Sequence, residues 1–302
     1  MILLGAENQS LVVFLRELLA SQDPTKTRKE GSFSDFDDAL ITVDVQDGII
    51  NIRLEWGCIK DFTANGSSEV LEAVYKGLGL KLEADRVSIA VPLNDVPKDE
   101  KARDELIMKL ARIKAHLFSG PLLRIMNANA GDISKIQPLQ IEVRFGEWIW
   151  IVPKADGSFL CGFSNTVSDK SDLPIAKVLY NEFNSIRDSQ LNAAPSVQAS
   201  EQPPKDLQGF TIPNKDQIDG YFLFFFQKRH FASEPAKDRL VGQLAMFRPY
   251  INYHFKCTKA FTHYRMRTCT ESLQQVLNRA KPEQKLGRGT KTFTGRTMKE
   301  FK

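Results

Sequence analysis

Residues 236–251, AKDRLVGQLAMFRPYI, repeat the apolar pattern of residues 102–117, ARDELIMKLARIKAHL, at a constant offset of 134. Both segments have the three- and four-residue spacing of an amphipathic helix. Amphipathic helices resemble one another through this shared period, so the match gains weight only from the elements around it. The matched pairs are Ala102 with Ala236, Leu106 with Leu240, Leu110 with Leu244, Ile113 with Phe247, and Leu117 with Ile251.

The elements before both helices have the same predicted order. Residues 39–56 alternate in polarity around the turn Asp47-Gly48, which predicts a β-hairpin. A short helix over 67–78 and a strand over 87–91 then lead into the first long helix, which we expect Ser119-Gly120-Pro121 to end. In the second half we expect strands over 141–145, 148–152, 159–163 and 221–226, a helix over 174–186, and a long helix from Ala236.

This order predicts a duplicated unit. The fold class is α+β, with two similar α/β sandwich-like domains over residues 1–120 and 121–302. Each domain has an antiparallel sheet and a long helix, and the second helix is extended at the C-terminus. Residues 192–218, rich in Pro, Gln and Ser, account for the larger offset of the last elements and are expected to be a loop insertion.

The second long helix has no Gly or Pro between Tyr250 and Lys281. If it is helical over 236–280, it is about 67 Å long, more than the width of about 40 Å expected for its own domain. It therefore needs a partner surface. Pro249 removes one helical hydrogen bond, so we expect a kink near residues 245–249, with a helix break as the alternative.

The end of the chain is strongly basic. Residues 248–302 contain thirteen Lys or Arg and three Asp or Glu, a net charge of +10, whereas the whole chain is only +4. Such a concentration indicates an acidic partner. Within the long helix, Lys256, Lys259, His263 and Arg267 form a basic stripe opposite a broad apolar and aromatic side. A solvated face is the ordinary explanation of a basic stripe, but the near absence of acids favours binding here.

Other kinds of chemistry find little support. The chain has no P-loop, Rossmann fingerprint or nucleophile elbow, so we expect no enzyme and no cofactor. His254, Cys257, His263 and Cys269 do not converge on a continuous helix, and we expect no metal. The four scattered cysteines favour free thiols in a reducing compartment. We expect no signal peptide and no membrane span.

Three segments near the C-terminus carry a family resemblance: residues 256–267 (KCTKAFTHYRMR), 276–282 (VLNRAKP) and 291–297 (KTFTGRT). They resemble the family of subunit 2 of the actin-related protein 2/3 complex, the nucleator of branched actin filaments. Residues 220–230, the start Met1-Ile2-Leu3-Leu4 and the run Asp35-Phe36-Asp37-Asp38 agree with it. The matching segments follow the same order along the whole chain, although the first 120 residues match the family loosely.

The resemblance implies a non-enzymatic, actin-binding scaffold in the cytoplasm and cytoskeleton, in actin-rich cell projections or actin patches. Its partners would be subunit 4, the actin-related subunits of the same seven-chain complex, and the side of the mother filament. The implied subunit face is Phe247, Ile251, Phe255 and Phe261. The implied filament contacts are Lys256, Lys259, His263, Arg265, Arg267, Arg279 and Lys281.

A nucleic-acid-binding module is the alternative function, because a basic helix also suits phosphates. The aromatic residues on the other side of the helix favour a protein partner, so we expect no nucleic acid.

Overall fold

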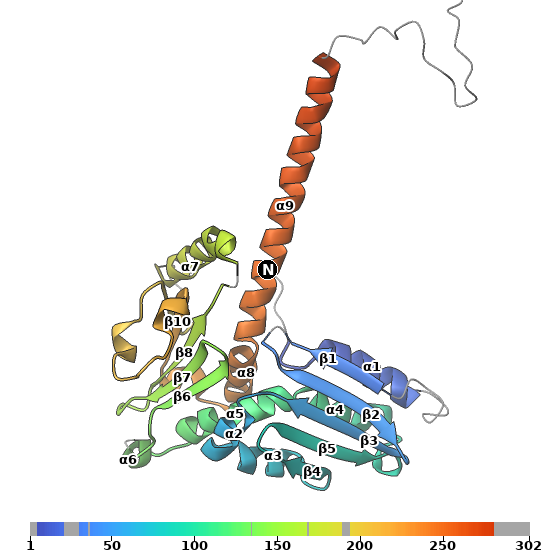
Figure 1. The fold of residues 1–302 in the computed structure, drawn as a ribbon. Coiled ribbons are helices and arrows are strands. Elements are labelled where there is room, and N and C mark those ends of the chain that lie inside the picture. Colours follow the sequence, from blue (N-terminus) through green and yellow to red (C-terminus); the bar gives the residue numbers. More distant parts are fainter. Residues whose placement is uncertain are drawn as a thin grey trace, which may run out of the picture. The chain divides into compact units, whose positions relative to one another are not determined.

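The computed structural model describes residues 5–20, 30–35, 37–133, 135–167, 169–188 and 194–280. The chain divides into two compact units after Phe255. The first unit contains all the strands of the described residues in two five-stranded antiparallel sheets (Figure 1). The second unit begins inside the last helix.

The first sheet has the strand order β1-β2-β3-β5-β4. Its strands are β1 (Glu30–Ser34), β2 (Leu40–Gln46), β3 (Ile49–Glu55), β4 (Gly79–Leu82) and β5 (Arg86–Pro92). Buried and half-buried residues alternate along β5, as expected for a sheet with one face on the core. The accompanying helices are α1 (Gln9–Ala20), α2 (Ile59–Phe62), α3 (Ser68–Val74), α4 (Glu100–Ala111) and α5 (Ile113–Met126).

The second sheet has the order β6-β7-β8-β10-β9, the same arrangement as the first. This match confirms the predicted α+β fold with two similar sheets, whereas the domain boundary at residue 120 stays a prediction. The strands are β6 (Leu139–Arg144), β7 (Glu147–Pro153), β8 (Phe159–Asn165), β9 (Ser196–Ser200) and β10 (Gly220–Phe226). The helices are α6 (Ala130–Ile133), α7 (Leu173–Asp188), α8 (Glu234–Ala245) and α9 (Phe247–Ala280).

Both predicted long helices are broken at corresponding residues. Arg112 (φ −96°, ψ 13°) separates α4 from α5, and Met246 (φ −98°, ψ 0°) separates α8 from α9. The two breaks are 134 residues apart, the offset found in the sequence. The prediction of one continuous helix from residue 236 to 280 was therefore wrong. The structure has the helix break that we gave as the alternative to a kink. Pro249 is the third residue of α9, where a backbone amide has no partner inside the helix.

The expectation that Ser119-Gly120-Pro121 ends a helix was also wrong, because α5 continues through Pro121 to Met126. Proline cannot donate to the carbonyl four residues earlier, that of Leu117. The Ser67 hydroxyl donates to this carbonyl instead, at 2.5 Å. Glycine at 120 makes the approach possible, since a Cβ there would lie 2.3 Å from the Ser67 nitrogen. These residues form a close helix contact rather than a stop.

The second sheet is covered on both faces. All residues of β8 are buried, and so are all but one of β10. On the face away from the main core, Trp148, Trp150 and Tyr221 form a smaller core with residues of the predicted insertion: Leu207, Ile212 and Ile218. The insertion over 192–218 is therefore more than a loop. Where it is described, it supplies edge strand β9 and a cover for the outer sheet face.

Candidate functional site

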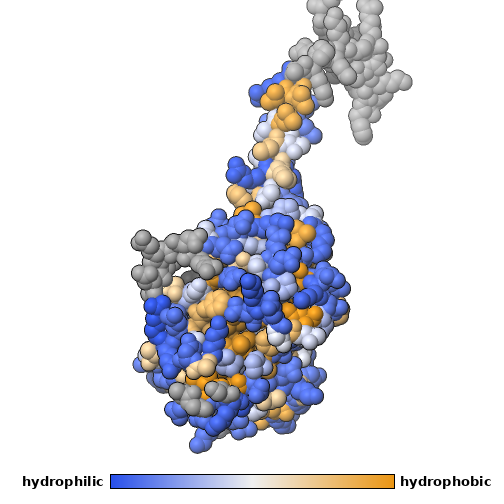
Figure 2. Space-filling model, turned by 90° about the vertical axis from the view of Figure 1, so that its left-hand side faces the viewer, coloured by the Kyte–Doolittle hydropathy of each residue, from blue (hydrophilic) through white to orange (hydrophobic). Residues whose placement is uncertain are grey.

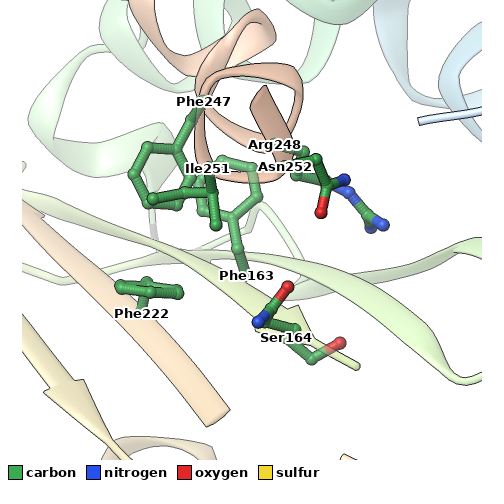
Figure 3. A pocket seen from close by; sticks show the side chains of 8 residues that line it. Phe163, Ser164, Phe222, Phe247, Arg248, Ile251 and Asn252 are labelled. Atoms are coloured by element: carbon green, nitrogen blue, oxygen red, sulfur yellow. The ribbon is translucent and has the colours of Figure 1, made fainter. Parts of the chain in front are cut away.

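Helix α9 carries the predicted site, and its first turn is held in the core of the first unit. The Phe247 ring contacts the rings of Phe163, Phe222 and Phe224 at centroid distances of 4.9, 5.3 and 4.7 Å. Ile251, one turn later, is 2% exposed. Figure 3 shows Phe247 and Ile251 pointing from α9 toward the sheet residues. The remaining cavity between them measures only about 10 Å³, so the first turn of α9 is tightly packed.

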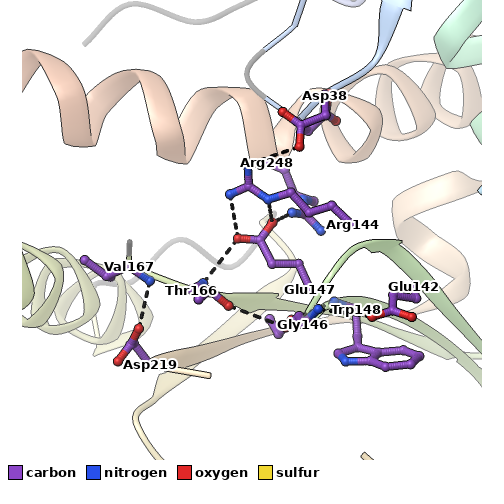
Figure 4. A network of polar contacts seen from close by, with 12 residues as sticks. Asp38, Glu142, Arg144, Gly146, Glu147, Trp148, Thr166, Val167, Asp219 and Arg248 are labelled. Carbon is purple, nitrogen blue, oxygen red and sulfur yellow. Dashed lines mark hydrogen bonds and ion pairs between the residues drawn. The ribbon is translucent and has the colours of Figure 1, made fainter. Parts of the chain in front are cut away.

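Arg248, the next residue of α9, is buried in a network of charges (Figure 4). It forms an ion pair with Glu147, which is 1% exposed and also accepts from Arg144 Nε at 2.6 Å. Arg144 in turn lies 3.6 Å from Asp38. Burial lowers the pKa of Arg248 to about 10, and the charge of Asp37 opposes this shift. Arg248 therefore remains protonated at neutral pH, and the acidic groups around it compensate the cost of burying its charge.

The run 35–38 supplies the acids on the other side of this network. Lys114 of α5 is buried, and its ammonium lies 2.8 Å from Asp35 and 2.7 Å from Asp37. Burial alone would lower the pKa of Lys114, but the charges of Asp37 and Asp35 raise it above its ordinary value. We term Asp35, Asp37, Asp38, Lys114, Arg144, Glu147 and Arg248 the charge hub. It joins the start of α9 to the ends of β6 and β7, and through Asp38 to the segment between β1 and β2, which in turn contacts α5.

The four residues of the predicted subunit face differ in burial. Phe247 and Ile251 are buried in the chain's own core, so they have almost no surface left for a partner. Phe255 is half-buried and packs against the same core. Phe261 is 60% exposed. Phe261 and part of Phe255 therefore remain available, and their role in partner binding stays a prediction.

The predicted filament contacts lie in the second unit. Five described Lys or Arg and one acid, Glu271, give residues 256–280 a net charge of +4. Lys259 is half-buried, and the Arg265 guanidinium lies 5.8 Å from the centre of the Phe261 ring. Lys281 lies outside the described residues. The exposed members of the set are Lys256, His263, Arg265, Arg267 and Arg279.

The same helix exposes apolar side chains between its cations (Figure 2). Those more than half exposed are Phe261, Tyr264, Met266, Leu273, Val276 and Leu277. Isolated apolar residues are ordinary on a protein surface, but six within five turns of one helix are typical of a partner-binding segment. The arrangement can bury an apolar side and present cations to an acidic surface.

Within the described ranges, no group of three or more His, Cys, Asp or Glu is placed to hold a metal ion. The same ranges contain no helix long and apolar enough to cross a membrane. Burial raises the pKa of the Cys58 and Cys161 thiols well above their usual value.

Sequence reasoning missed the charge hub. It used the aspartates at 35, 37 and 38 only in the family resemblance, and it did not use Glu147 at all. One signal was present: Glu147 opens the apolar strand EWIWIV, an unusual position for an acid unless a cation is buried beside it.

Comparison with known proteins supports a family assignment. The P34-Arc family model, described as Arp2/3 complex, 34 kD subunit p34-Arc, matches residues 52–284. The chain is 26% identical to actin-related protein 2/3 complex subunit 2 of Dictyostelium discoideum, covering 90% of this chain and 92% of the relative. It is also 26% identical to the subunit of the same name from Schizosaccharomyces pombe, covering 99% of each.

Proposed function

Since the chain belongs to the P34-Arc family of Arp2/3 complex 34 kD subunits, we propose that it is a non-enzymatic, actin-binding subunit of that complex. In this role it supports actin nucleation and branching in the cytoplasmic actin cytoskeleton. Helix α9 pairs with subunit 4, the resulting core holds the actin-related subunits, and the basic stripe contacts the side of the mother filament.

The observation that carries this proposal is the composition of α9 beyond Phe255. This segment combines exposed apolar residues with a net charge of +4, while the first turn of the same helix is fixed in the core. An apolar side suits a permanent protein partner. A basic side suits the acidic actin surface, where complementary charge raises the association rate and specificity.

The filament contact is tested by reversing Lys256 and Arg267 together, K256E/R267E, in the assembled complex. Filament co-sedimentation and branch formation should fall, and the residual binding should depend less on salt, because screening acts on exposed charge pairs. A control of equal charge change is K60E/K76E, at two exposed lysines far from α9 in the sequence. Unchanged filament binding by K256E/R267E, or an equal loss in the control, would reject the contact.

The basic segment also favours one other function, a nucleic-acid-binding module. That function predicts that the logarithm of the affinity for DNA or RNA falls linearly with the logarithm of the salt concentration. If the purified chain binds neither nucleic acid at low salt, this alternative is excluded.

A further inference from the structure

We propose that residues 201–218, which we term the strap, open from the second sheet as one unit while the sheet stays folded. The strap lies in the connection between β9 and β10 and is drawn in gold beside this sheet in Figure 1. Opening exposes an aromatic face of Trp148, Trp150 and Tyr221 that the closed strap hides. The proposed function assigns no role to this part of the chain.

The fold itself does not need the strap. In the first sheet, residues 83–85 are enough to connect β4 to β5, the pair that corresponds to β9 and β10. The strap occupies most of the longer connection over 201–219. It contains no residue of the β9–β10 pairing, which begins at Ser200 and Tyr221. Opening the strap therefore leaves every strand pair of the second sheet intact.

The strap accompanies a change in the outer face of the sheet. In the first sheet the outer residues at the centre are polar, with Arg53 paired to Thr42 and Ser88. At the corresponding position of the second sheet, Gly162 is paired to Trp150 and Leu223. The aromatic face and its strap thus belong to the second sheet alone, and they are an addition to the repeated framework.

The strap is attached mainly by apolar contacts. Its side chains Leu207, Ile212 and Ile218 are buried against the aromatic face. Among the described residues, its backbone–backbone hydrogen bonds join residues of the strap to one another and none joins it to a strand. Exposed ion pairs contribute little to stability. The polar contacts with neighbouring elements are of this exposed kind: Gln140 Nε2 to the Thr211 carbonyl at 3.1 Å, Lys154 to Asp206 at 3.4 Å, and Lys177 to Glu201 at 3.0 Å.

Three polar groups beneath the strap oppose its closure. The indole N–H groups of Trp148 and Trp150 and the hydroxyl of Tyr221 are buried without a hydrogen-bond partner among the described residues. A buried donor without an acceptor destabilises the state in which it is buried. Trp56 of the first unit differs, because its indole N–H donates to the Asp37 carbonyl at 3.3 Å. Opening lets water reach the three groups, so the strap should open at a lower free energy than the sheet unfolds.

The test is hydrogen exchange at the indole N–H groups of the full-length chain, followed by NMR. The chain has three tryptophans, so Trp56 is an internal reference in the same sample. Trp150 is 0% exposed, and its indole proton should exchange through opening of the strap. The rate should hardly change in low urea, because a local opening exposes little surface. The amide protons of β10 should exchange about ten-fold more slowly or less, with the urea dependence of global unfolding.

Two substitutions should change this rate in opposite directions. Y221F removes one unpaired group and should slow exchange of the Trp150 indole proton about ten-fold. Y75F is the matched control and should leave the rate unchanged, because the Tyr75 hydroxyl is equally buried but lies 3.0 Å from the Lys109 carbonyl. L207A removes a buried side chain of the strap and should speed the exchange about ten-fold or more. Q208A, at the exposed next residue, should not.

Two outcomes would overturn the proposal. One is a Trp150 indole proton that exchanges at the rate and with the urea dependence of the β10 amides, because opening would then require unfolding of the sheet. The other is a Y221F chain whose Trp150 indole proton exchanges as fast as in the wild type, because the unpaired groups would then not oppose closure. Exchange ahead of β10, slower in Y221F and faster in L207A, is the result that supports the strap.

Discussion

Replacing Arg248 by Ala should destabilise the first unit strongly, although Arg248 lies in a helix whose later turns are exposed. Arg248 is 5% exposed and Glu147 is 1% exposed, so the variant leaves a buried carboxylate without its closest cation. Removing one partner of a buried ion pair costs about 3–5 kcal/mol. Arg144 still donates to Glu147, which places the expected loss at the lower end, about 3 kcal/mol.

The assay is urea unfolding of the full-length chain, followed by circular dichroism and by the fluorescence of the buried tryptophans. A double-mutant cycle with Glu147→Ala isolates the pair, and it should give a coupling energy of about 1–3 kcal/mol. Arg16→Ala is the matched control, because Arg16 pairs with Asp104 where both side chains are about half exposed, and its stability should hardly change.

Two results would refute this reasoning. One is an R248A variant whose free energy of unfolding stays within about 1 kcal/mol of the wild type, because the loss of one partner from a buried ion pair should destabilise the protein by more than that. The other is strict additivity of the two single-variant stability changes in the cycle, which would mean that Arg248 and Glu147 have no energetic interaction.

Two further predictions concern α5. Gly120→Ala should destabilise the chain by about 1–3 kcal/mol in urea unfolding, because the new Cβ meets the backbone of Ser67. Gly209→Ala is the control and should not destabilise the chain, because no atom lies within 4 Å of a Cβ built there. Equal effects of the two substitutions would argue against the close contact at Gly120. His116 contacts the Tyr75 hydroxyl at 2.8 Å, and burial lowers its pKa to about 4. Because the unfolded chain binds this proton more readily, stability is fully present above about pH 6.5 and falls by up to about 3 kcal/mol as the pH drops toward 4. His116→Asn should remove that part of the pH dependence, and an unchanged slope in a pH series of urea melts would contradict the assignment.

Much of the fold could be predicted because the repeated elements are long and periodic. The hairpin around Asp47-Gly48 and the strand over 221–226 were correct, and they are elements whose side chains face a core. Strands β1, β4 and β9 were missed. They are edge strands of four or five residues, held mainly by backbone pairing that leaves little pattern in the side chains.

The candidate site could be predicted only in part. The cations of α9 were visible in the sequence because charge needs no tertiary context. Which apolar residues of α9 are free for a partner could not be predicted, because Phe247 and Ile251 have the same periodicity as the residues beyond them. Only the packing against the sheet shows that these two are buried. The charge hub depends on contacts between residues far apart in the chain, such as Lys114 with Asp37, which no local pattern encodes.

The most direct test of complex membership is purification of the tagged chain from the cells that express it, with quantification of the proteins that remain bound. We predict recovery in equal amounts of the other subunits of the complex, including both actin-related chains. Recovery of the chain alone, as a monomer under conditions where the first unit is folded, would contradict the proposed function.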